Sequence, residues 1–150
     1  MRRPSVRALI FVVLAMVSTG LLAGCDGGPT PGSEAAVTRQ KANDTLIRQL
    51  QALPGATVTA DVTSSLDGGQ NNIGVDARLP AAATMAQTNA LGDSIERTIW
   101  LSRVNPMGRI SIDITRQGSR VPVQQRQYLD EIDTRPLGVK YGPRPDGLPG

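Results

Sequence analysis

The residue with the most distinctive chemistry in this 150-residue chain is Cys25, because it carries the only thiol. It closes the tetrapeptide LAGC at 22–25, which follows a basic start (MRRPSVR), an unbroken apolar run at 8–17 and three small or polar residues. That order of regions is typical of a secretory signal peptide. The apolar run is shorter than the roughly 20 residues that a membrane-spanning helix needs, so the pattern predicts export rather than a membrane span.

The tetrapeptide LAGC resembles the lipobox of bacterial lipoproteins, in which a small residue precedes an acceptor cysteine. The resemblance implies cleavage after Gly24, a diacylglyceryl thioether on Cys25 and a mature chain that begins at Cys25. Two acyl chains hold a protein durably on a membrane, since each buried methylene contributes about 0.8 kcal/mol. We therefore expect a lipoprotein signal peptide at 1–24 and a lipid anchor on the extracytoplasmic face of the cell membrane. The alternatives are an ordinary secretory signal with a chance cysteine, or an uncleaved anchor.

The composition excludes several classes of chemistry. The chain has no histidine, which removes the commonest general base and transition-metal ligand. With its only thiol assigned to the lipid, the sequence predicts no cysteine nucleophile, no zinc cluster and no internal disulfide. Three of the 16 cationic residues lie in the signal peptide, so the mature chain has 13 cations and 13 anions and no net charge to attract nucleic acid. We expect no catalytic residue, no metal, no cofactor and no nucleic-acid partner.

The remaining candidate sites have stronger structural explanations. The stretch DGGQNN at 67–72 offers oxygen ligands but lacks the spaced carboxylates of a calcium loop, so a hairpin turn is favoured. The acidic run of Asp130, Glu131 and Asp133 is interpreted as a solvated surface. A serine-lysine pair would need Lys41 or Lys140, and neither has a supporting motif.

Two further candidates are a tryptophan and a set of arginines. Trp100 falls on the apolar side of a predicted helix and is interpreted as core rather than as a ligand platform. Five arginines could line one edge and meet anionic lipid headgroups or a polymer phosphate, with ordinary surface charge as the favoured alternative: Arg97, Arg103, Arg109, Arg116 and Arg120.

Hydrophobic periodicity predicts two helices and three strands after a flexible tether at 25–33. Ser33 can cap a helix that begins at Glu34 and ends before the Pro-Gly pair at 54–55. Apolar and polar residues alternate over 56–66 and 73–79, which predicts a hairpin. Thr84 and Gln87 fit a capping box for a helix to about residue 102. We expect this helix to bury Met85, Leu91, Ile95, Ile99 and Trp100, with Gly92 as a weak point.

A third strand is predicted at 110–115, which gives the order helix, strand, strand, helix, strand. This order predicts an α+β domain at 34–120, with a small antiparallel or mixed sheet and two helices on one face, an incomplete ferredoxin-like arrangement. Residues 121–150 are expected to form an extension that packs on the domain or is partly disordered. Val121 and Val123 could form an edge strand around Pro122, and the proline- and glycine-rich last fifteen residues are expected to wrap the surface or fray.

Beyond the lipobox, the segments at 95–114 and 141–149 look like parts of small actinobacterial lipoproteins with no assigned activity. That resemblance carries over no catalytic residue. The sequence therefore predicts a non-enzymatic, lipid-anchored binding or adaptor module whose partner is another envelope component, foremost a protein. The alternative is a carrier or sensor of a small apolar or anionic ligand, held between the sheet and the C-terminal segment.

Overall fold

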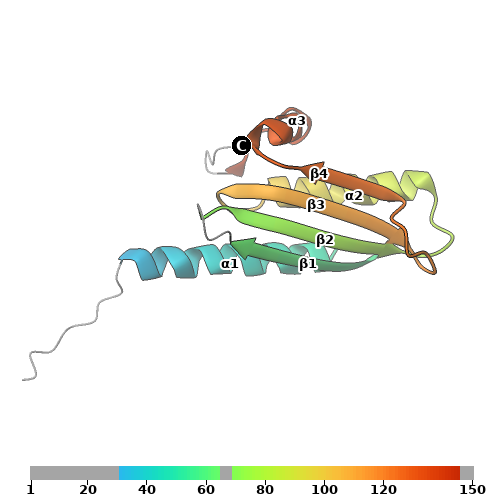
Figure 1. The fold of residues 1–150 in the computed structure, drawn as a ribbon, viewed down its shortest axis with the longest axis horizontal. Coiled ribbons are helices and arrows are strands. Elements are labelled where there is room, and N and C mark those ends of the chain that lie inside the picture. Colours follow the sequence, from blue (N-terminus) through green and yellow to red (C-terminus); the bar gives the residue numbers. More distant parts are fainter. Residues whose placement is uncertain (1–30, 65–68, 146–150) are drawn as a thin grey trace, which may run out of the picture.

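The computed structural model describes residues 31–64 and 69–145. Its strands form one mixed sheet, and the predicted α+β class is confirmed (Figure 1). A fourth strand and a third helix follow the elements that the sequence predicts. In chain order the elements are α1 (Pro31–Gln51), β1 (Thr57–Ser64), β2 (Asn71–Leu79), α2 (Met85–Trp100), β3 (Met107–Arg116), β4 (Gln124–Tyr128) and α3 (Glu131–Tyr141).

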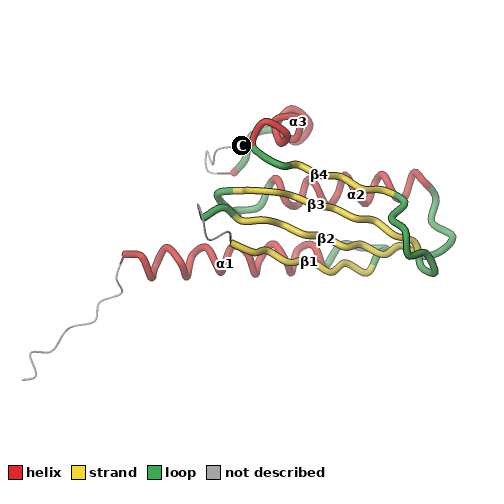
Figure 2. The backbone as a smooth tube through the Cα atoms, in the orientation of Figure 1, coloured by secondary structure: helices red, strands yellow, loops and turns green. Residues whose placement is uncertain are grey.

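The sheet has the strand order β1-β2-β3-β4 (Figure 2). β1 and β2 form the predicted antiparallel hairpin, in which Val62 lies opposite Ile73. β2 and β3 are parallel, with Val75 opposite Ile112, and α2 connects them. β4 pairs antiparallel with β3 and forms the second edge of the sheet. The C-terminal segment therefore supplies the strand that the predicted arrangement lacks.

The hydrophobic core lies between the sheet and the layer of α1 and α2. Successive side chains of a strand point to opposite faces, so every second residue of β3 faces the helices. Ile110, Ile112 and Ile114 are each at most 1% exposed. Each large side chain buried in this way contributes roughly 1.5–3 kcal/mol. The helices contribute Leu46, Leu50, Leu91, Ile95 and Ile99 to the same cluster.

α2 begins as the sequence predicts. The amide of Gln87 donates to Oγ1 of Thr84 at 3.2 Å, and the amide of Thr84 donates to the Gln87 side chain at 2.8 Å, which completes the capping box. The expected burial of Met85 is wrong, because this residue occupies the first helical position and is 53% exposed. The buried stripe starts one turn later, at Thr88.

The first helix begins earlier than predicted. α1 already includes Pro31, so Ser33 lies within the helix rather than capping it, and the last three residues predicted as tether are helical. Proline suits a first helical turn because its missing N–H would have no partner there. Cys25, Leu66 and Asp67 lie outside the described residues, so the expectations for them stay predictions.

The C-terminal segment contributes β4 and α3, which pack on the preceding elements. The edge strand predicted at 121–123 lies instead at Gln124–Tyr128, and Val121 is 70% exposed. Part of the segment predicted to wrap or fray forms α3. The side chain of Asp130 caps this helix by accepting from the amide of Asp133 at 3.0 Å. Asp130 and Asp133 therefore lie at the start of a helix, where their negative charge suits the helix dipole.

Candidate functional site

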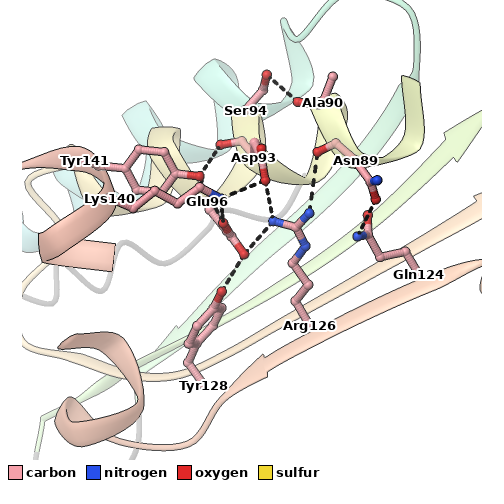
Figure 3. Close-up of polar contacts among 10 residues, drawn as sticks. All are labelled: Asn89, Ala90, Asp93, Ser94, Glu96, Gln124, Arg126, Tyr128, Lys140 and Tyr141. Atoms are coloured by element: carbon pink, nitrogen blue, oxygen red, sulfur yellow. Dashed lines mark hydrogen bonds and ion pairs between the residues drawn. The ribbon is translucent and has the colours of Figure 1, made fainter. Parts of the chain in front are cut away.

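Among the described residues, the largest assembly of charged side chains joins α2, β4 and α3 (Figure 3). We call it the Glu96 cluster. It contains two carboxylates, two cations and the only two tyrosines of the chain: Asp93, Glu96, Arg126, Lys140, Tyr128 and Tyr141.

Local structure explains how these side chains meet. Asp93 and Glu96 are three residues apart, so they share one face of α2. Arg126 and Tyr128 are two residues apart in β4 and point to the helix-covered side of the sheet, opposite Ile112 and Ile110. The last turn of α3 then brings Lys140 and Tyr141 to the same place.

Glu96 is the centre of the cluster, and its side chain is only 3% exposed. One carboxylate oxygen, Oε1, accepts a short hydrogen bond from the hydroxyl of Tyr128 and lies 2.7 Å from Nη1 of Arg126. The other, Oε2, accepts from Nζ of Lys140 at 3.2 Å and from the hydroxyl of Tyr141 at 3.0 Å. Both oxygens are therefore fully occupied by groups of the protein itself.

These contacts decide the charge state of the cluster. Burial acts to raise the pKa of Glu96, but its hydrogen bonds outweigh burial and hold the pKa below its usual value. Hydrogen bonds from Lys140 and Arg126, each 2.8 Å long, lower the pKa of the half-exposed Asp93. Burial and the bond to Glu96 raise the pKa of the Tyr128 hydroxyl. At neutral pH the cluster thus holds two carboxylates, two cations and two neutral phenols.

The arrangement fastens the C-terminal segment to α2. A general base needs a lone pair that can reach a substrate and a pKa near the working pH. Glu96 has neither, since its oxygens are occupied and its pKa is lowered. The chemistry of the cluster is therefore that of a buried ion-pair network, in which each charge offsets the desolvation of its neighbours.

Gly92 allows the Arg126 side chain to pack against α2. The sequence marks it as a weak point of α2, yet the residue is buried beneath the Arg126 side chain. A Cβ atom at this position would lie 2.7 Å from Cζ of Arg126. Glycine therefore lets the guanidinium cross the helix closely enough to reach both carboxylates.

A second set of contacts attaches the residues that follow α3. Trp100 is core, as predicted, with 3% exposure, and its indole N–H donates to the carbonyl of Gly142 at 2.7 Å. The buried guanidinium of Arg144 lies 5.7 Å from the centre of the Trp100 ring. It also donates to the carbonyls of Ser102 and Val104 at 3.4 and 2.5 Å, which lie just beyond the end of α2.

The other candidate residues identified from the sequence do not come together at one site. Of the stretch at 67–72, Asn71 is the first residue of β2 and is fully buried, accepting from Ser64 at 3.0 Å and donating to the carbonyl of Pro106 at 3.0 Å. The five arginines do not line one edge, because Arg109 and Arg116 lie near opposite ends of β3. Lys140 belongs to the Glu96 cluster, whereas Lys41 lies on α1.

The described part of the chain contains neither a cluster of metal-ligating side chains nor a helix that could span a membrane. Over residues 31–64 and 69–145, no three of the side chains from histidine, cysteine, aspartate and glutamate gather as metal ligands. None of the three described helices combines the length and the apolar character that crossing a membrane requires.

A groove of about 960 Å³ runs along α1, from Ala35 to Gln49. We call it the α1 groove. It runs between this helix and the turn after α2, not between the sheet and the C-terminal segment where the sequence places a ligand. Among its lining residues are Ala35, Val37, Thr38, Arg39, Lys41, Ala42, Leu101, Arg103 and Asn105.

The polar residues of the Glu96 cluster could not be found by searching for catalytic motifs. The one available signal was that both tyrosines of an aromatic-poor chain fall in the C-terminal segment.

Comparison with known proteins adds no assignment: no protein-family model, no curated protein and no solved structure matches this chain.

Proposed function

We propose that this protein is a lipid-anchored component of a bacterial cell envelope and that its α+β domain is a non-enzymatic binding or adaptor module. The observation that carries the proposal is the sequence LAGC at 22–25, which places the only thiol of the chain at the end of a signal-peptide pattern. The lipid on Cys25 holds the domain at the extracytoplasmic face of the cell membrane, where it binds another envelope protein.

The character of the domain supports a binding role. Its largest charged assembly is used internally, because the ion pairs of the Glu96 cluster join three elements of the same domain. The surfaces left for a partner are the α1 groove and the sheet face opposite the helices. That sheet face carries polar side chains such as Thr59, Asp76 and Asp113.

The anchor is tested by substituting its acceptor. In the native envelope, we expect Cys25→Ala to abolish incorporation of a labelled fatty acid and to leave uncut precursor or soluble protein. Thr19→Ala, which changes the signal region but keeps the thiol, is the matched control and should behave as wild type. Cell fractionation and intact mass report the outcome. A Cys25→Ala protein that is processed normally and stays as tightly membrane-bound as wild type would show that the anchor proposal is wrong.

A carrier or sensor of a small apolar or anionic ligand is the second candidate, and the volume of the α1 groove favours it. Ligand pockets typically have volumes of about 300–1,000 Å³, and the groove falls in that range at about 960 Å³. The two candidate functions predict different binding partners for the wild-type protein. Crosslinking on intact cells should capture a protein for the adaptor, whereas a stoichiometric small molecule in native mass spectra would support the carrier.

A further inference from the structure

The α1 groove differs from the Glu96 cluster in its balance of charge. Among the described residues that line it there are three cations, Arg39, Lys41 and Arg103, and neither an aspartate nor a glutamate. Within the described part of the chain, neither Arg39 nor Lys41 forms an ion pair. The groove is therefore a cationic surface on a domain whose mature chain carries no net charge, and it complements an anion.

The same groove exposes apolar side chains. Val37 is 68% exposed and Leu101 is 37% exposed, and both lie in its lining together with Ala35 and Ala42. A surface that combines exposed apolar groups with cations is suited to the boundary between water and an anionic bilayer. There the apolar groups enter the headgroup region and the cations meet phosphates.

The position of the groove along the chain brings it close to the anchor. Only six residue steps separate Cys25 from the first residue of α1, and a fully extended chain of that length spans at most about 20 Å. Each helical residue adds about 1.5 Å, so Thr38 lies about 10 Å further along the helix. The groove thus begins within reach of the membrane that holds the lipid.

We propose that the α1 groove docks on the anionic phospholipid headgroups of the membrane in which Cys25 is anchored. Arg39 and Lys41 contact phosphates, while Val37 and Leu101 enter the interfacial layer. The proposal rests on the lipid anchor proposed above. It orients the domain with α1 toward the bilayer and turns the polar face of the sheet away from it, toward a partner.

The test uses the lipidated full chain reconstituted into vesicles. An environment-sensitive fluorophore is attached to Thr38→Cys in the groove or, as the matched control, to Thr59→Cys on the opposite face of the sheet. The vesicles contain phosphatidylcholine alone or phosphatidylcholine mixed with phosphatidylglycerol. Lipidation occupies the Cys25 thiol, so only the introduced cysteine reacts. Labelling of Cys25 in the unsubstituted chain would contradict the anchor itself, which separates that failure from failure of the docking proposal.

We expect a blue-shifted emission only for the label at 38, only on phosphatidylglycerol vesicles, and its loss at high salt because salt screens charges. Reversing both charges, Arg39→Glu with Lys41→Glu, should lower the ratio of docked to undocked protein at least about 25-fold, because the loss of each cation alone costs about fivefold. Arg97→Glu with Arg120→Glu makes the same charge change at exposed positions outside the groove and should have no effect.

Two results would overturn the proposal. One is a label at 38 that stays equally exposed on both kinds of vesicle. The other is a groove reversal that leaves the emission unchanged but removes an acidic protein from the set crosslinked on cells, which would make that protein the occupant of the groove. Equal melting temperatures for both double variants confirm that the comparison concerns binding and not folding.

Discussion

At the scale of single residues, Glu96 shows how a charge can be buried in this domain. Its side chain is 3% exposed, and four donors from two other elements, β4 and α3, surround it. A carboxylate buried without partners would be strongly destabilising. Glu96 can be buried only because the four donors offset the loss of its contacts with water. Removing the charge from Glu96 should therefore disturb more than one contact.

The first prediction concerns this residue. Glu96→Gln keeps the size of the side chain but replaces an acceptor oxygen with an N–H group that faces donors. Breaking a buried ion pair from one side typically costs about 3–5 kcal/mol of unfolding free energy, and we expect a loss near the lower end because Asp93 still contacts both Arg126 and Lys140. Urea denaturation measures the loss. Glu34→Gln, the same change on the exposed part of α1, should be silent, and equal midpoints would contradict the role given to Glu96.

At the scale of elements, buried and exposed side chains alternate along each strand, and this alternation determines which face of the sheet packs on the helices. Ile112 is fully buried, whereas its neighbour Asp113 lies on the other face and accepts from Gln125 of β4 at 2.9 Å. Ile112→Asp places an unpaired charge in the core and should destabilise the domain by several kcal/mol or unfold it. Asp113→Asn, one residue away, should change the melting temperature little. Similar melting temperatures for the two variants would contradict the register of β3.

The order of elements up to β3 could be predicted because local signals determine it. The alternation in β1 and β2 and the Thr84 box each depend on residues close together in the sequence. The start of α1 was missed by three residues, since a proline is compatible with either a tether or a first turn. The last strand was expected close to its place, at 121–123 rather than 124–128, because its partner β3 is near in the sequence. The last helix was missed because its contacts are distant: Lys140 binds Glu96, which lies 44 residues away.

At the scale of the whole molecule, the pH dependence of stability follows from the shifted groups. Asp93 and Glu96 have folded-state pKa values below their ordinary values of 3.8 and 4.5. Their contribution is therefore fully present above about pH 4.5 and is lost as the pH falls through the folded values. Tyr128 has a raised pKa, so its contribution is present below its ordinary value of 10.0 and is lost at higher pH.

We accordingly expect the unfolding free energy to be level between these limits and to fall on either side of them. Chemical denaturation at a series of pH values measures the profile. Substituting both carboxylates, Asp93→Asn with Glu96→Gln, should flatten the acid limb relative to wild type after correction for the lower overall stability. An acid limb with the same slope in both proteins would show that other carboxylates cause it.

If the chain is exported as proposed above, the sequence separation within the Glu96 cluster has a consequence for the order of folding. A chain that leaves the translocation channel with its N-terminus first presents Glu96 well before its partners. Tyr128 emerges 32 residues later, Lys140 44 residues later and Tyr141 45 residues later. The hairpin, α2 and β3 can assemble while the channel still holds the rest, but Oε2 of Glu96 stays hydrated until the last turn of α3 arrives. Folding of the domain is thus completed only when the last residues of α3 leave the channel and bind Glu96.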